Sequence, residues 1–305
     1  MSIREDFEER ERRFMSPYGC LSANSRGRVR PEPLRSIRTA FQLDRDRIVF
    51  SNAFRRMKYK TQVFLSPLGD QYRTRLTHTL EVAHIARTIA RSMYRNEDLA
   101  EAIALGHDLG HTPFGHGGET ALKEIFSYSF AHNEQSLRVV DVLENQGRGL
   151  NLTYEVRDGI LKHAKGYGKI IPDDPEEKPC TVEGQIVRFA DIMAYLNHDL
   201  EDAVRSRVIH ESQVPDFCVK VLGRTHSERA TAMMRDLIYS SRAENGRMVL
   251  DTSGEMKEAM GQLRRFLYDN VYRSHQVHRE FMKAKKILSE LFSYFLENQI
   301  GRAHV

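Results

Sequence analysis

The sequence predicts a mostly α-helical protein, and three observations support that prediction. Apolar side chains recur at the helical spacing of about 3.6 residues through 76–94 and again through 183–204. No longer segment alternates apolar and polar residues with a period of two, so a half-buried sheet is not expected. The segment RMVLDTS (247–253) is the one short stretch with the composition of a strand. Repeated helical patterns with so little strand signal are typical of an all-α fold.

The expected elements follow in chain order from the same periodicity and from turn-forming residues. Residues 1–15 predict a charged helix or a frayed arm, and the segment 16–36, with its prolines and glycines, predicts an irregular stretch. Helical periodicity resumes at residue 44. Later helices are expected at 76–94, 98–109, 119–128, 133–145, 153–165, 183–204, 211–222, 226–241, 255–270 and 277–297. A tight loop is expected at 111–119, where one proline and three glycines interrupt the pattern, and an exposed excursion at 166–179.

Length and composition are those of an ordinary globular protein. The 305 residues are 40% hydrophobic and 29% charged, and a chain of this length can bury a full core. No apolar run approaches the roughly 18 residues needed to span a bilayer, and the N-terminus has charges where a signal peptide has an apolar centre. The three cysteines, Cys20, Cys180 and Cys218, are far apart, which excludes a disulfide framework and indicates a reducing compartment. A cytoplasmic location without membrane association is therefore expected.

The positive charge is concentrated near the N-terminus. The whole chain has a formal net charge of +4, whereas its first 60 residues carry 15 Lys and Arg against 8 Asp and Glu. Five arginines fall within 13 residues: Arg26, Arg28, Arg30, Arg35 and Arg38. Because Pro31 and Pro33 forbid a continuous helix there, these arginines are expected on an extended arm. The segment is interpreted either as a solvated arm or as a surface for a polyanion, such as a regulatory nucleotide or single-stranded DNA.

The histidines gather in one part of the chain. Five of the 13 lie between residues 78 and 116, with His132 close behind; these five are His78, His84, His107, His111 and His116. Histidine is the commonest protein metal ligand and titrates nearest neutral pH. A lone buried histidine is usually a satisfied core residue. A cluster across two helices and a glycine-rich loop instead predicts a metal site or an acid–base centre.

Four residues make up the expected metal site. His107 and Asp108 adjoin at the end of an apolar helix, and His78 lies on the preceding helix. Asp191 lies within an apolar run, where a carboxylate is costly to bury without a partner. Two histidines and two carboxylates suit Mn²⁺, Fe²⁺, Zn²⁺ or Co²⁺, with Mg²⁺ at a more carboxylate-rich position. The ligand types alone do not choose among these ions.

The H…HD…D order of these four residues resembles the signature of the HD-domain phosphohydrolases. More specifically, four segments resemble the deoxyguanosine-triphosphate triphosphohydrolases and related dNTPases: 38–64, TRLTHTLEVAHIAR (74–87), GHDLGHTPFGHGGE (106–119) and RFADIMAYLNHDLEDA (188–203). The resemblance runs from about residue 18 to about residue 290. It implies a mostly helical fold and metal-dependent hydrolysis of a dNTP to the deoxynucleoside and inorganic tripolyphosphate. The family's metal ligands fall on the same four residues.

The resemblance also implies roles for residues around the metal. The family's catalytic positions fall on His111, His116, Glu119 and His132, with Glu119 orienting His116. Its phosphate contacts fall on Arg75 and Tyr195, its sugar contacts on Gln62 and Asp199, and Tyr272 matches a tyrosine beneath the deoxyribose. The helical repeat agrees in part, because Arg75 lies three residues before His78 and so faces the same side.

Simpler interpretations of several histidines stay open. His111 is alternatively a hydrogen-bond partner behind the reacting groups, and His132 a helix-terminal residue without a chemical role. The remaining histidines are predicted to be structural or on the surface: His84, His163, His198, His210, His226, His275, His278 and His304.

The resemblance divides the chain into three regions and leaves two other functions open. Residues 1–60 are expected to form the basic arm and first helices, 61–205 the HD phosphohydrolase core, and 206–305 a helical extension that completes the substrate pocket. Many relatives continue further, so a shortened C-terminal region is expected, and a homo-oligomer is expected because relatives form them. One alternative is another HD phosphohydrolase, a 5′-nucleotidase or phosphodiesterase. The other is a nucleic-acid-binding regulatory protein with a vestigial metal site.

Overall fold

The computed structural model describes residues 2–62, 73–164 and 170–298, without the side chain of His116. The described residues are helical apart from irregular connections, two isolated bridges and one antiparallel hairpin of β1 (Arg242–Glu244) and β2 (Arg247–Val249). The helices are α1 (Ile3–Phe14), α2 (Ala40–Val49), α3 (Asn52–Arg56), α4 (Arg75–Ser92), α5 (Glu97–Gly106), α6 (Gly115–Ile125), α7 (His132–Arg138), α8 (Glu144–Gly147), α9 (Tyr154–Leu161), α10 (Val182–Arg205), α11 (Asp216–Leu222), α12 (His226–Ser240), α13 (Gly254–Leu267) and α14 (His275–Glu297). The all-α prediction is confirmed.

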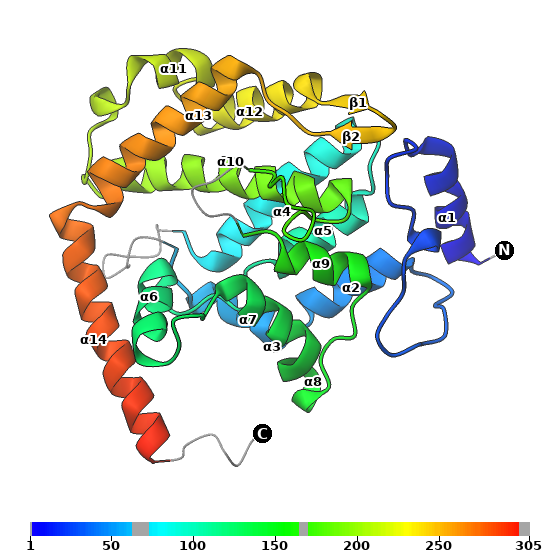
Figure 1. Ribbon diagram of the computed structural model, residues 1–305, viewed down its shortest axis with the longest axis horizontal. Helices are drawn as coiled ribbons and strands as arrows, with labels where there is room; N and C mark the ends of the chain where they lie inside the picture. Colours follow the sequence, from blue (N-terminus) through cyan, green and yellow to red (C-terminus); the bar gives the residue numbers. More distant parts are fainter. Residues whose placement is uncertain (1, 63–72, 165–169, 299–305) are drawn as a thin grey trace.

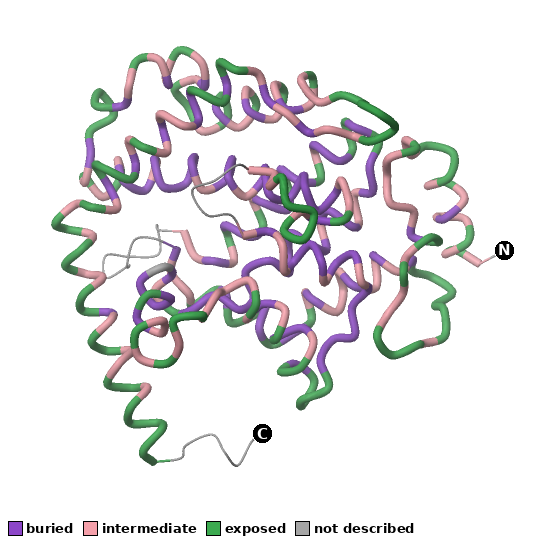
Figure 2. Tube along the Cα trace, in the orientation of Figure 1, coloured by how far each residue is buried: buried purple, intermediate pink, exposed green. Residues whose placement is uncertain are grey.

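Helix α10 forms the centre of the molecule. In Figure 1 it runs across the middle, with α4, α5 and α9 on one side and α11, α12 and α13 on the other. Its apolar residues, among them Ile186, Met193 and Leu196, are fully buried between these layers, and Figure 2 shows most of the helix as buried. Apolar burial on two sides fixes the orientation of α10, and with it the polar side chains that interrupt its apolar surface.

Some element boundaries differ from those expected, each for a local reason. Helix α6 begins at Gly115, inside the expected loop 111–119, after Phe114 adopts a left-handed conformation with φ 65°. Helix α11 begins at Asp216 rather than 211, because Pro215 interrupts the helical pattern there. The helices expected over 133–145 and 255–270 each end in a π-helical turn, at 139–143 and 268–272.

Two local features position the ends of α4 and α5. The Thr74 hydroxyl accepts a hydrogen bond from the Thr77 amide and starts α4 at Arg75, which puts His78 one turn into the helix. After α5, the chain passes directly against α7 at Gly110. A Cβ atom on Gly110 would lie 2.1 Å from the Ser136 backbone nitrogen, so no other residue fits there without movement of the backbone.

The basic N-terminal segment is attached to the body of the protein. Arg28 pairs with the buried carboxylate of Asp44, and Arg38 pairs with Asp46. Arg30 donates a hydrogen bond to a backbone carbonyl 2.6 Å away. This differs from the expectation that the arginines are displayed on an extended arm, because these side chains hold the segment in place.

Two broader predictions can be compared with the structure. All three cysteines are free thiols, as expected from their spacing. Within the described ranges, we find no helix that combines the length and the apolar character needed to cross a bilayer.

Candidate active site

A pocket of about 440 Å³ lies against α4 and α10, and the turn after α13 contributes to its wall. Most of the site residues predicted from the sequence line it: Gln62, Arg75, His78, Asp108, His111, His132, Asp191, Tyr195, Asp199 and Tyr272. His107 and Glu119 are buried and contact lining residues without lining the pocket themselves. The side chain of His116 lies outside the described residues. The fold therefore brings together in one cavity residues from four distant parts of the sequence.

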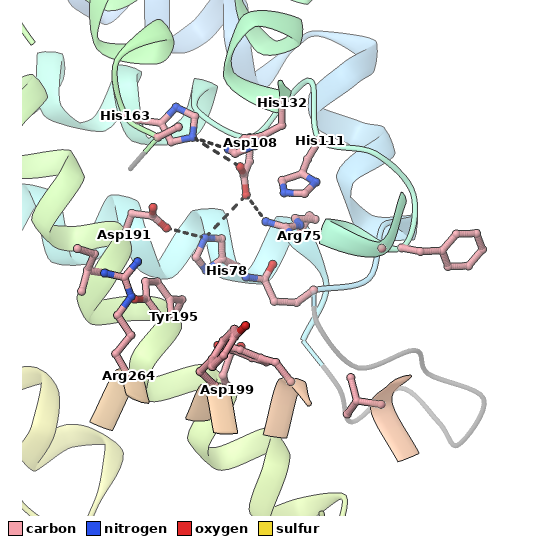
Figure 3. A pocket seen from close by; sticks show the side chains of 18 of the residues that line it. Arg75, His78, Asp108, His111, His132, His163, Asp191, Tyr195, Asp199 and Arg264 are labelled. Atoms are coloured by element: carbon pink, nitrogen blue, oxygen red, sulfur yellow. Dashed lines mark hydrogen bonds and ion pairs between the residues drawn. The ribbon is translucent and has the colours of Figure 1, made fainter. Parts of the chain in front are cut away.

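The four expected metal ligands converge on one end of this pocket. His78 Nε2 lies 3.2 Å from Asp191 Oδ1 and 3.8 Å from Asp108 Oδ2. His107 Nε2 lies 3.4 Å from the same Asp108 oxygen and 4.0 Å from Asp191 Oδ1. Figure 3 shows His78, Asp108 and Asp191 facing one another across this space. Two imidazole nitrogens and two carboxylate oxygens this close suit a divalent transition metal ion.

Hydrogen bonding and burial give two of these groups the form that a metal ion requires. His107 Nδ1 lies 2.6 Å from the Ala104 carbonyl and donates to it, so Nε2 carries the lone pair. That Nε2 is buried and has no hydrogen-bond partner among the described residues. Burial lowers the pKa of His107, which favours its neutral form. Although burial opposes it, nearby positive charge, including that of Arg75, holds the pKa of Asp108 well below its usual range. Such an orphaned nitrogen beside a carboxylate fits a metal ligand set.

Arg75 places a cation beside the expected metal ligands. Its side chain is 4% exposed, and Nη1 donates to Asp108 Oδ2 at 2.7 Å. The Nε and Nη2 atoms are buried without a hydrogen-bond partner among the described residues. A buried guanidinium with unused donors at a pocket wall is suited to binding an anion such as phosphate.

The other end of the pocket contains carboxyl and phenol groups. Asp199 lies two turns after Asp191 on α10 and accepts a hydrogen bond from the Tyr272 hydroxyl. Burial raises the pKa of Asp199 to about 7, although the hydrogen bond from Tyr272 opposes this. Tyr195 lies between the two aspartates along the helix and also lines the pocket. Groups of this kind can bind hydroxyls of a sugar-like ligand.

A second group of histidines lies beside the expected metal ligands. His132 Nδ1 is 3.1 Å from Glu119 Oε2, and His132 Nε2 is 3.2 Å from His163 Nε2. His111 stacks on His132, with ring centroids 4.6 Å apart. Glu119 therefore contacts His132. The implied pairing of Glu119 with His116 involves a side chain outside the described residues.

The chain is similar to curated proteins along nearly its whole length. A deoxyguanosinetriphosphate triphosphohydrolase-like protein from Desulfatibacillum aliphaticivorans is 65% identical over 298 residues, covering 98% of this chain and 85% of that protein. The chain belongs to this family. A family member from Caldanaerobacter subterraneus subsp. tengcongensis is 53% identical over 298 residues, and the match covers 98% of this chain and 84% of that protein. The HD domain family matches residues 75–196 and the phosphohydrolase-associated domain family residues 250–302. This chain is therefore an HD hydrolase.

Solved structures share the fold of this HD protein. A hypothetical protein from Aquifex aeolicus has a TM-score of 0.54 and 26% identity, covering 82% of this chain. A phosphohydrolase from Bacteroides thetaiotaomicron has a TM-score of 0.50 at 20% identity, covering 80% of this chain, which shows the fold alone. This chain spans 61% and 54% of the length of those two chains.

Several residues of this HD site were not predicted from the sequence. His163 was interpreted as structural or on the surface, yet it lines the pocket, with Nε2 4.0 Å from Asp108 Oδ1. Arg264 and Tyr268 also line the pocket, from α13 and the turn after it. His198 is fully buried behind the pocket and contacts His78. The helical repeat offered a signal for His198. It lies seven residues, or about two helical turns, after Asp191, which places both side chains on the same face of the helix.

We expect Asp199→Asn to stabilise the metal-free HD protein at high pH. The folded state raises the pKa of Asp199 to about 7, whereas the group titrates near 3.9 when unfolded. The folded state therefore retains a proton that the unfolded state loses, and the parent loses stability as pH rises from about 4 to about 7. Asparagine removes this dependence and still accepts a hydrogen bond from Tyr272. In urea unfolding, the gain in the free energy of unfolding should be about 2.6 kcal/mol larger at pH 8 than at pH 5.

The exposed Asp269 provides the matched control for this prediction. Asp269→Asn should change the free energy of unfolding by the same small amount at both pH values. An equal effect of Asp199→Asn at pH 5 and pH 8 would show that Asp199 does not retain a proton in the folded state.

Proposed function

We propose that this chain hydrolyses a deoxynucleoside triphosphate to the deoxynucleoside and inorganic tripolyphosphate, using a divalent metal ion. The observation that supports this most is the convergence of four ligand atoms beside Arg75, whose Nε and Nη2 donors face no hydrogen-bond acceptor in the described part of the chain. The membership in a family of deoxyguanosinetriphosphate triphosphohydrolase-like proteins supports the same reaction. We propose His78, His107, Asp108 and Asp191 as the ligands of Mn²⁺, Fe²⁺, Zn²⁺, Co²⁺ or Mg²⁺.

The bond that breaks in this reaction joins the α-phosphorus to the 5′-oxygen. A bound divalent ion supplies Lewis-acid activation of water and neutralises phosphate charge. Arg75 binds a phosphate oxygen through its unused donors, and Tyr195 donates a second hydrogen bond to the phosphates. The water oxygen bonds to phosphorus, and the departing 5′-oxygen takes a proton. Tripolyphosphate and a 5′-hydroxyl are the products.

We assign the proton transfers to the histidines and Glu119. In this proposal His116 donates the proton to the leaving oxygen, and Glu119 orients the histidine that does so. The contacts of Glu119 and His163 with His132 support a second path, in which His132 is held at both ring nitrogens and passes a proton along the group. His111, stacked on His132, keeps that ring in place.

The sugar end of the pocket supports a preference for deoxyribose. In our proposal Gln62 and Asp199 bind sugar hydroxyls, and Tyr272, fixed by its hydrogen bond to Asp199, packs beneath the ring. A ring packed against C2′ leaves an added hydroxyl without space or a partner. We therefore propose that dNTPs are better substrates than ribonucleotides.

We further propose a cytoplasmic homo-oligomer. Helix α14 packs against α6 and leaves a row of apolar side chains exposed, which is surface available to a second copy: Met282, Ile287, Leu291, Tyr294, Phe295 and Leu296. A regulatory nucleotide or single-stranded DNA remains a proposed partner of the basic N-terminal segment, through arginines such as Arg35 that stay exposed.

Product analysis tests the proposed reaction. Purified protein is incubated with Mn²⁺ and each of the four dNTPs, with GTP as the ribose control, and the products are separated by ion-exchange chromatography. Tripolyphosphate and deoxynucleoside in equal amounts support the proposal. Orthophosphate as the only inorganic product would assign the chain to the nucleotidases, and no turnover with any substrate would favour a binding protein.

A further inference from the structure

His198 connects two residues of α4 from inside the protein. It lies on α10 and is fully buried. One ring nitrogen, Nδ1, is 3.2 Å from His78 Nδ1, and the other, Nε2, is hydrogen bonded to Glu81 Oε2. Glu81 lies three residues after His78, so both face α10 from the same side of α4. His78, His198 and Glu81 therefore form a continuous chain that leads away from the pocket.

The protons on this chain follow from one requirement. To bind a metal ion, His78 must present a lone pair at Nε2, the atom that faces Asp108 and Asp191. Neutral His78 then carries its proton on Nδ1 and donates it to Nδ1 of His198. His198 in turn carries its proton on Nε2, where the carboxylate of Glu81 accepts it. If His198 instead carried its proton on Nδ1, that N–H would donate to Nδ1 of His78. His78 would then carry its own proton on Nε2, and its lone pair would point away from the metal site.

We propose that His198 and Glu81 are positioning residues that fix the tautomer and ring orientation of His78 for metal binding. This inference rests on the metal centre of the proposed function. Glu81 selects the tautomer of His198, and His198 selects that of His78. Ligating histidines commonly donate their second ring N–H to a neighbouring acceptor, and loss of such a partner typically lowers metal affinity about 10- to 100-fold.

The surroundings of Glu81 support this role. Arg73 Nε lies 3.2 Å from Glu81 Oε1, and Arg73 Nη2 lies 2.7 Å from Glu201 Oε2. Although burial opposes it, the hydrogen bond from His198 and the charge of Arg73 lower the pKa of Glu81 to about 2, which keeps it a carboxylate acceptor. His226 stacks on His198, with ring centroids 5.9 Å apart, and its Nε2 lies 3.5 Å from Glu81 Oε2.

The same groups offer one competing assignment. Atoms of Glu81, His198 and His226 lie close enough together to hold a second metal ion. Two observations favour the positioning role. Glu81 is already the direct hydrogen-bond acceptor of His198, and Arg73 already supplies the positive charge that an ion would bring.

Metal titration of the metal-free protein tests the proposal. Mn²⁺ binding is measured by isothermal titration calorimetry for the parent, Glu81→Ala, Glu81→Gln and His198→Phe. We expect Glu81→Ala and His198→Phe to bind Mn²⁺ about 10- to 100-fold more weakly. Glu81→Gln keeps an acceptor oxygen and should recover part of the affinity. His84→Phe replaces an exposed histidine of the same helix and serves as the matched control, with affinity within about two-fold of the parent.

A double variant makes the test specific to a chain of contacts. Once His198→Phe breaks the chain, removal of Glu81 should cost nothing more, so the double variant should bind Mn²⁺ as weakly as His198→Phe alone. In parallel, ¹⁵N-histidine NMR of the metal-free protein, with His78→Asn to assign the signal, should show one His78 tautomer in the parent and a mixture in Glu81→Ala. If His198→Phe does not fold, the two Glu81 variants carry the same comparison.

The outcomes separate this inference from the proposed reaction. Unchanged Mn²⁺ affinity in Glu81→Ala, additive losses in the double variant, or two ions per parent chain with one lost in Glu81→Ala would overturn the positioning role and leave the reaction intact. A parent that binds no Mn²⁺ would overturn both. If Glu81→Ala keeps the parent fold but binds Mn²⁺ more weakly, and the parent forms tripolyphosphate, the result supports both the positioning role and the proposed reaction.

Discussion

Asp108→Asn is expected to release the metal ion and to lower kcat by at least about 10³-fold. Asp108 Oδ2 is 3.4 Å from His107 Nε2 and 3.8 Å from His78 Nε2, so this oxygen lies close to the proposed ligand nitrogens of both histidines. The amide removes the negative charge, and the loss of several kcal/mol of charge stabilisation corresponds to a rate factor of about this size. An amide oxygen still accepts the hydrogen bond from Arg75, so the protein should stay folded. Elemental analysis and turnover with dGTP measure the two effects.

The control for this prediction is a second buried aspartate outside the pocket. Asp158 is 7% exposed, and its carboxylate accepts a hydrogen bond from the Cys180 amide. Asp158→Asn should keep one metal ion per chain and a kcat within a few-fold of the parent. Equal metal content in Asp108→Asn and the parent would remove Asp108 from the ligand set.

The helical architecture could be predicted because it depends on local pattern. The periodicity of 183–204 reflects burial of α10 on two sides, and the observed helix, Val182–Arg205, differs by one residue at each end. Boundaries that depend on tertiary contacts could not be predicted in the same way. Helix α6 begins at Gly115 because the chain turns through a left-handed residue, Phe114, which apolar periodicity does not record.

The proposed metal ligands could be selected from the sequence because of their residue types and their order along the chain. Asp191 interrupts an apolar run, and the pocket explains why a charge is tolerated there. His163 gave no comparable signal. It enters the site from the end of α9, and only the packing of α9 against α7 brings it within 3.2 Å of His132. Such contacts between separate helices carry no periodic signature.

Arg75→Lys is expected to keep the metal ion and to lower kcat/KM about 10²- to 10³-fold. Lysine retains the positive charge that pairs with Asp108, whose Oδ2 accepts a hydrogen bond from Arg75 Nη1 at 2.7 Å in the parent. The proposed ligand set should therefore stay intact. It loses the planar fork whose Nε and Nη2 atoms lack a partner within the described residues. One or two charge-assisted hydrogen bonds to phosphate, at about 1.5–3 kcal/mol each, account for a loss of this size. Steady-state kinetics with dGTP and elemental analysis measure the two quantities.

Arg87 on the same helix provides the comparison that isolates the pocket. Its side chain is 44% exposed, and its guanidinium nitrogens lie 3.5 Å from carboxylate oxygens of Glu97 and Glu101. Arg87→Lys should change kcat/KM by less than about two-fold, since exposed ion pairs contribute little. The inhibition constant of inorganic tripolyphosphate should rise in Arg75→Lys and not in Arg87→Lys, because the inhibitor carries the phosphates without the nucleoside. If Arg75→Lys keeps both its metal ion and the kcat/KM of the parent, the phosphates bind elsewhere in the pocket, and Arg75 serves only to hold Asp108 in place.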